Sequence, residues 1–183
     1  LPGLIGSRGI WPASDHMRAY RDAQGVGFFD EPTLAWLSAS DAFLHFLCAL
    51  CVALAVALAL GLAPRLVLGL LWLCWLSLVQ VGGPFLSFQW DLMLIETLFF
   101  SIFFAPAGWR PKLPTEAEPP AWSRFLVVLI LFKVTFFSGV VKLASGDPSW
   151  RDLTALTYHY WTQPLPAWTS YVAHQWPVGV HQA

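Results

Sequence analysis

The sequence predicts an all-α membrane protein, a polytopic transmembrane helix bundle with about four spanning helices. Of its 183 residues, 57% are hydrophobic and 11% are charged, whereas soluble domains carry roughly 25% charged residues. The apolar residues also gather in long runs, and an α-helix needs about 20 such residues to cross a bilayer core of about 30 Å. A soluble fold could not bury this much apolar surface, so membrane lipid is the expected partner of the runs.

Four apolar runs separated by prolines and glycines are the expected spanning helices. They make up a bundle over residues 41–142, with Ser40 as the N-cap of the first helix. Residues 1–40 are broken by prolines and charges, which predicts a loop region with short helices, and residues 143–183 form a polar, aromatic tail with short helices. The four runs occupy residues 41–62, 66–81, 88–105 and 124–141.

Basic residues near the helix ends predict the orientation, because loops rich in Lys and Arg stay in the cytoplasm. The turn between the second and third runs carries no basic residue. The regions before and after the bundle are therefore expected on the non-cytoplasmic side. The first turn and the last loop, expected in the cytoplasm, carry Arg65, Arg110, Lys112 and Arg124.

Four charged residues lie within or at the ends of the last two predicted helices. Charged groups in a membrane find partners, and consecutive helices pack antiparallel. We therefore expect Glu96 to pair with Lys133 near mid-membrane, and Asp91 to pair with Lys142 at the non-cytoplasmic end. The simplest interpretation is that these pairs hold the helices together. The alternative is a buried acid or base, since desolvation can turn a lysine into a proton acceptor.

The residues after the last run suggest a turn into a short helix. Asp147 can cap this helix, Pro148 suits its first position, and Trp150 would anchor at the membrane interface. The functional alternative is a surface for a client or partner protein, made of Asp147, Trp150, Arg151, Tyr158, His159 and Gln163.

Several function classes lack their sequence signals. A net charge of -1 without a basic patch argues against nucleic acid as a partner. The histidines lack metal-ligand spacing, and no phosphate loop or nucleophile elbow is present, so neither a metal nor another cofactor is expected. The four runs also lack the paired inverted halves of many transporters. Cys48 and Cys51 lie inside the first run, where they are expected to pack rather than react.

Ordered blocks of the sequence resemble the lipase maturation factor family. They are FLSFQWD at residues 85–91, LIE at 94–96, SGVVKLASGDPSWRDLT at 138–154, YHY at 158–160 and TQPLP at 162–166, and GLIGSRGI at 3–10 and SDAFLH at 40–45 fit the same family. One departure is Trp161, where the family has an acidic residue. The family also continues before and after this region, so we expect the chain to be a piece of a longer protein.

This resemblance implies a multi-pass protein of the endoplasmic reticulum membrane in animals, or of the inner membrane in bacteria. It implies a chaperone-like role in folding and assembly of secreted client proteins such as homodimeric lipases, which would meet its lumenal or periplasmic surfaces. A non-enzymatic maturation factor is therefore the first expectation.

A more distant resemblance is to the vitamin K-dependent γ-carboxylase and HTTM-type membrane superfamily. The segment from Gly139 to Leu143 is similar to the one that carries the carboxylase's catalytic lysine, and Lys142 matches that lysine. A histidine that the carboxylase has around the segment matching residues 85–91 has no clear equivalent. The alternative function is thus a membrane enzyme with Lys142 as its base.

Overall fold

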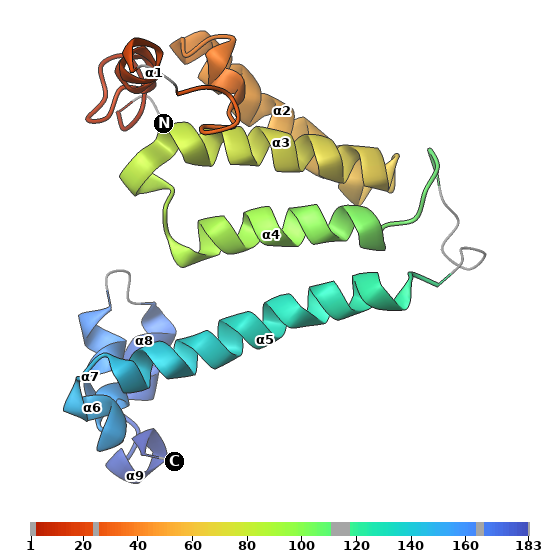
Figure 1. Cartoon of the computed structure of the whole chain (residues 1–183). Helices are drawn as coiled ribbons and strands as arrows, with labels where there is room; N and C mark the ends of the chain where they lie inside the picture. The colour runs from red at the N-terminus through yellow and green to blue at the C-terminus, as the bar shows by residue number, and fades with distance from the viewer. Residues whose placement is uncertain (1–2, 24–25, 111–117, 164–166, 183) are drawn as a thin grey trace. The chain divides into compact units, whose positions relative to one another are not determined.

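The computed structural model describes residues 3–23, 26–110, 118–163 and 167–182, and over these ranges it contains helices and no strand. The predicted all-α class is therefore confirmed. The chain divides into two compact units, Leu1–Ile130 and Leu131–Ala183, each described by itself. In chain order the helices are α1 (Ala13–Asp22), η1 (Leu34–Trp36), α2 (Asp41–Ala59), α3 (Pro64–Gly82), η2 (Gly83–Phe85), α4 (Gln89–Phe104), α5 (Ala121–Ala144), α6 (Pro148–Arg151), α7 (Ala155–Thr162), α8 (Trp168–His174) and α9 (Val178–His181) (Figure 1).

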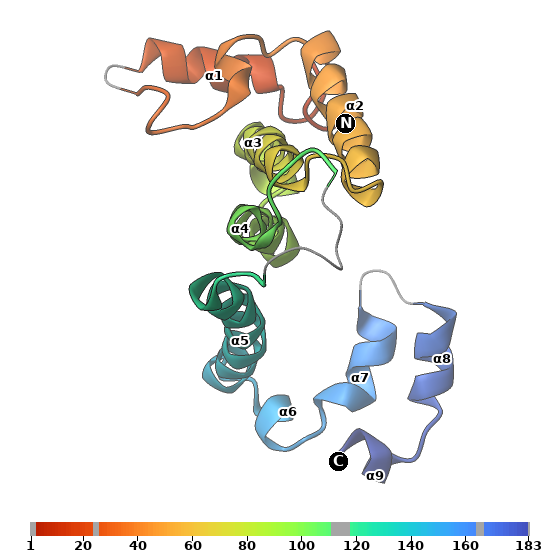
Figure 2. The same ribbon diagram turned by 90° about the vertical axis from the view of Figure 1, so that its right-hand side faces the viewer.

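Helix α3 is the centre of the first unit. It packs against both α2 and α4, and it also contacts α1 and η1; Figure 2 shows it between α2 and α4. Half of the residues in its most hydrophobic stretch (50%) are buried, against 11% for α2. The outer helices are therefore the ones that present most of their surface to lipid.

Within the described residues, three helices are long and apolar enough to cross a membrane: α2, α3 together with η2, and α5. The segment predicted at residues 88–105 forms α4, which has 16 residues and is about 24 Å long at 1.5 Å per residue. This is shorter than a hydrocarbon core of about 30 Å. About four membrane helices remain consistent with the structure, with α4 as the short member.

Local backbone chemistry sets the ends of α2 and α3. The hydroxyl of Ser40 accepts a hydrogen bond from the Phe43 backbone N–H at 3.3 Å, which confirms the predicted N-cap. Helix α2 ends at Ala59 rather than at residue 62, because Gly61 adopts the left-handed conformation (φ +71°) that commonly ends helices. Helix α3 begins at Pro64, two residues before the predicted start, because proline is well suited to the first helical position.

Helix α5 extends beyond its predicted ends at residues 124 and 141. The predicted limits were set by Arg124 and Lys142, yet long basic side chains at helix ends can place their charges in the interface while the helix continues. The helix has 24 residues and ends at Ala144. Gly146 follows with φ +76°.

The first forty residues fold onto the membrane helices instead of remaining wholly in water. Polar contacts fix them to α2 and α3: Ser7 donates two hydrogen bonds to Asp41, both at 2.7 Å, and Thr33 donates to the Ser77 carbonyl at 3.0 Å. Apolar contacts form a core between this segment, α2 and α3. Its buried members are Ile5, Ala13, Met17, Ala35, Leu44, Leu47, Cys74, Leu78 and Val81.

In the second unit, the chain after α5 forms the short helices α6, α7, α8 and α9. Helix α7 packs against α8 and α9, and Figure 2 shows α7 and α8 side by side. The described residues of the tail therefore form a small helical assembly on the end of a membrane helix, and they include all six residues of the predicted partner surface.

Candidate functional site

Asp91, the first of the predicted membrane charges, lies in the first turn of α4. It is buried, and its carboxylate accepts a hydrogen bond from the Phe88 backbone N–H at 3.2 Å. A carboxylate at this end of a helix is stabilised by the helix dipole. The Trp75 indole also donates to the Asp91 carbonyl at 3.2 Å, which ties α3 to α4. Within the first unit, Asp91 therefore caps α4 and helps to fix its start.

Lys142 lies in the last turn of α5, and its Nζ is 4.7 Å from the centroid of the Trp150 ring. This is a cation–π contact, in which the negative face of the ring attracts the ammonium charge. Trp150 belongs to α6, so the contact holds α6 against the end of α5. Arg151 adds to this by donating to the Leu143 carbonyl at 3.5 Å.

The two predicted ion pairs would each join the first unit to the second. Glu96 and Asp91 belong to α4, whereas Lys133 and Lys142 belong to the part of α5 in the second unit. Glu96 and Lys133 each have an interaction partner in the structure. Both pairings stay predictions.

The turn into α6 has the predicted cap. The Asp147 carboxylate accepts a hydrogen bond from the Ser149 backbone N–H at 2.9 Å, and Pro148 is the first helical residue. Hydrogen bonding from Ser149 lowers the pKa of the Asp147 carboxyl. The charged form is therefore favoured at neutral pH, and Asp147 presents an exposed negative charge at the start of the short helix that ends with Arg151.

The remaining residues of the predicted partner surface divide into two kinds. Tyr158 and His159 are exposed on α7. Gln163 is half-buried, and its amide donates to the Tyr160 carbonyl at 3.3 Å and to the Ser170 hydroxyl of α8. Gln163 therefore joins α7 to α8, while Tyr158 and His159 are available to a partner.

A pocket of about 350 Å³ between α7 and α8 was not predicted. The Trp161 and His174 rings lie 5.6 Å apart at its wall, and the Nδ1 atom of His174 is buried without a hydrogen-bond partner among the described residues. From the sequence, His174 was considered only as a metal ligand. The closely spaced aromatic residues of α7 and α8 were the feature of the sequence that could have indicated this pocket. The lining residues are Tyr160, Trp161, Ala167, Trp168, Ser170, Tyr171 and His174.

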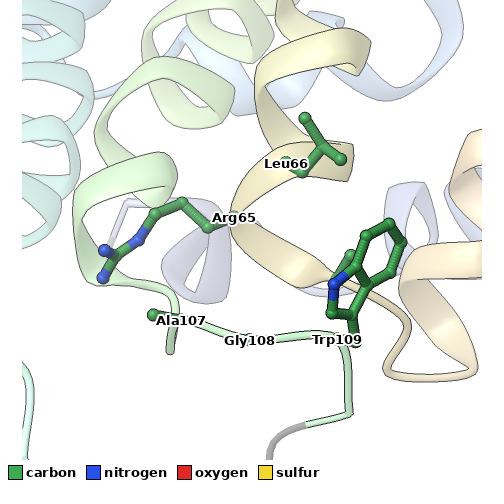
Figure 3. A pocket seen from close by; sticks show the side chains of 6 residues that line it. Arg65, Leu66, Ala107, Gly108 and Trp109 are labelled. Carbon is green, nitrogen blue, oxygen red and sulfur yellow. The ribbon is translucent and has the colours of Figure 1, made fainter.

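A second unpredicted cavity, of about 430 Å³, lies in the first unit where the turn from α2 to α3 meets the end of α4. Figure 3 shows Arg65 extending from the start of α3 toward α4, where it donates to the Ala105 carbonyl at 2.9 Å. The Ala63 N–H donates to the Trp109 carbonyl at 2.8 Å and closes the other side. In the sequence, Arg65 indicated only which side of the membrane the first turn occupies.

The long apolar helices are those of an integral membrane protein, and comparison of the sequence with known protein families identifies its family. The family model described as "Lipase maturation factor transmembrane domain" matches residues 1–183, and the chain belongs to the lipase maturation factor family. No solved structure matches the chain.

Named relatives agree with this family. Lipase maturation factor 2 of Xenopus tropicalis is 40% identical over 190 residues, which cover 97% of this chain and 26% of that protein. Lipase maturation factor 2 of Homo sapiens is 39% identical over 197 residues, covering 100% and 28%. Lipase maturation factor 1 of Homo sapiens is 31% identical over 188 residues, covering 98% and 33%. The chain thus spans between a quarter and a third of the length of these relatives.

The pairing of Glu96 with Lys133 is open to a double-mutant cycle on the intact protein in detergent. We expect Glu96→Gln and Lys133→Met each to lower the free energy of unfolding by up to about 3 kcal/mol, because each leaves a half-buried charge on a membrane helix without its predicted partner. The double variant should recover most of the loss. Glu118→Gln, in an exposed ion pair with Arg124, is the control and should change stability by less than about 1 kcal/mol. Additive losses in the cycle would contradict the pairing.

Proposed function

We propose that this chain is the membrane domain of a maturation factor that assists folding and assembly of secreted client proteins such as lipases. The observation that carries the proposal is the match of all 183 residues to the family's transmembrane domain. The relatives' names refer to lipase maturation. The proposed setting is the endoplasmic reticulum membrane in an animal cell or the inner membrane in a bacterium.

The proposed client surface lies on the second unit, on the non-cytoplasmic side of the membrane. The orientation follows from the basic residues of the first turn and last loop. The surface offers an exposed aromatic ring and imidazole at Tyr158 and His159 on α7. It also offers the exposed, opposite charges of Asp147 and Arg151 at the two ends of α6. Aromatic residues and arginine are enriched in protein–protein interfaces.

Lys142 is proposed to act as a structural cation. Its contact with Trp150 attaches α6 to α5, and this attachment supports the surface that α6 and α7 present. The γ-carboxylase-like alternative would instead require Lys142 to act as a base. The whole-chain family match does not favour that alternative.

Loss of the exposed groups on α7 should impair maturation without impairing membrane insertion. We expect the double variant Tyr158→Ala, His159→Ala of the intact protein to lower the activity of a co-expressed secreted dimeric lipase several-fold, at unchanged abundance in the membrane. Phe29→Ala is a matched control, because Phe29 is also a strongly exposed aromatic residue of a region expected on the same side. Equal lipase activity with the double variant and the control would contradict the proposed surface.

The same assay separates a structural Lys142 from a catalytic one. Lys142→Arg should retain most of the maturation activity, since arginine keeps the charge and stacks on an aromatic ring but cannot act as a base near neutral pH. Lys142→Gln should lower it, because the cation–π contact is lost. Complete loss of activity in a Lys142→Arg protein that inserts normally would favour the enzymatic alternative.

A further inference from the structure

The cavity at the turn from α2 to α3 has the composition of a site for an amphipathic molecule. Its volume of about 430 Å³ falls in the range of small-molecule sites. Its walls are apolar side chains and backbone, with one cationic side chain at the edge (Figure 3). The lining residues are Ala63, Arg65, Leu66, Ala107, Gly108 and Trp109.

The cavity lies at the depth of the lipid headgroups. Helices α2 and α3 are both long and apolar enough to span, and only residues 60–63 separate them. A turn this short between two spanning helices must lie at the membrane surface. Trp109, 77% exposed, fits this position, because tryptophan is enriched at the interface between membrane and water.

Arg65 is held at the cavity edge with donors to spare. Its hydrogen bond to the Ala105 carbonyl fixes the guanidinium at the end of α4, and a guanidinium has five N–H donors. The residue itself is exposed. Arg110, also exposed, follows Trp109 directly in the chain, and none of the described residues that line the cavity is acidic. The local charge is therefore complementary to an anion.

We propose that this cavity binds an anionic glycerophospholipid from the surrounding membrane leaflet. The lipid phosphate meets the Arg65 guanidinium, which suits the geometry of phosphate oxygens. The first part of an acyl chain lies against Leu66, Ala107 and Trp109. The bound lipid fills the space between the α2–α3 turn and the end of α4. It therefore links α2, α3 and α4.

The test measures lipid binding to the intact, delipidated protein in detergent by native mass spectrometry. Phosphatidylglycerol and phosphatidylcholine with identical acyl chains are titrated separately. We expect phosphatidylglycerol to bind the wild-type protein about tenfold more tightly. Both lipids carry a phosphate, but the choline cation of phosphatidylcholine offsets the phosphate charge and is repelled by the guanidinium. Arg65→Gln should abolish this preference, and Arg65→Lys should keep part of it. Ala107→Phe, which fills the cavity, should weaken binding of both lipids.

Arg21→Gln is the matched control, because Arg21 likewise donates to a backbone carbonyl, that of Trp36, at 3.1 Å but does not line the cavity. It should bind both lipids as the wild type does. Equal affinity of the wild-type protein for both lipids would overturn the proposal, as would a preference that survives Arg65→Gln. Competition by glycerol 3-phosphate as strong as that of the whole lipid would also overturn it, since the site would then bind a free phosphate.

Discussion

The hydrocarbon core of a membrane offers no hydrogen-bond partners, so backbone polar groups within it must be satisfied by the protein itself. Long helices meet this constraint in α2, α3 and α5, and the chain changes direction only where a residue can end a helix cleanly. Between α2 and α3, Gly61 follows the end of α2 and Pro64 begins α3. As a result, the polar groups available for binding gather at helix ends, where the protein meets the headgroups and water.

The same constraint explains why α3 organises the first unit. A helix with neighbours on several sides can use polar residues that a lipid-facing helix could not. Ser77 is an example, since it is fully buried, its hydroxyl accepts the Leu34 N–H at 3.0 Å, and its carbonyl accepts the Thr33 hydroxyl. These bonds dock the first forty residues onto α3. The N-terminal segment therefore belongs to the folded unit and covers part of the bundle on its own side.

Local signals were sufficient to predict the all-α class and the two caps at Ser40 and Asp147, because a cap depends on a few neighbouring residues. Longer-range features were not predictable in this way. Asp91 was predicted only as a partner for Lys142, yet its place in the first turn of α4 already suited it to cap that helix. The contact of Lys142 with Trp150 depends on the direction in which α6 leaves α5. The two cavities depend on how separate helices meet, which one sequence does not specify.

We propose that the second unit meets client proteins on the non-cytoplasmic side. The most direct test places a photoreactive phenylalanine analogue at Tyr158 in one intact protein and at Glu118 in another, each co-expressed with a secreted dimeric lipase. We expect a crosslink to the lipase from position 158 and none from position 118, which belongs to the loop expected in the cytoplasm. A crosslink from position 118 without one from position 158 would contradict both the proposed surface and the proposed orientation.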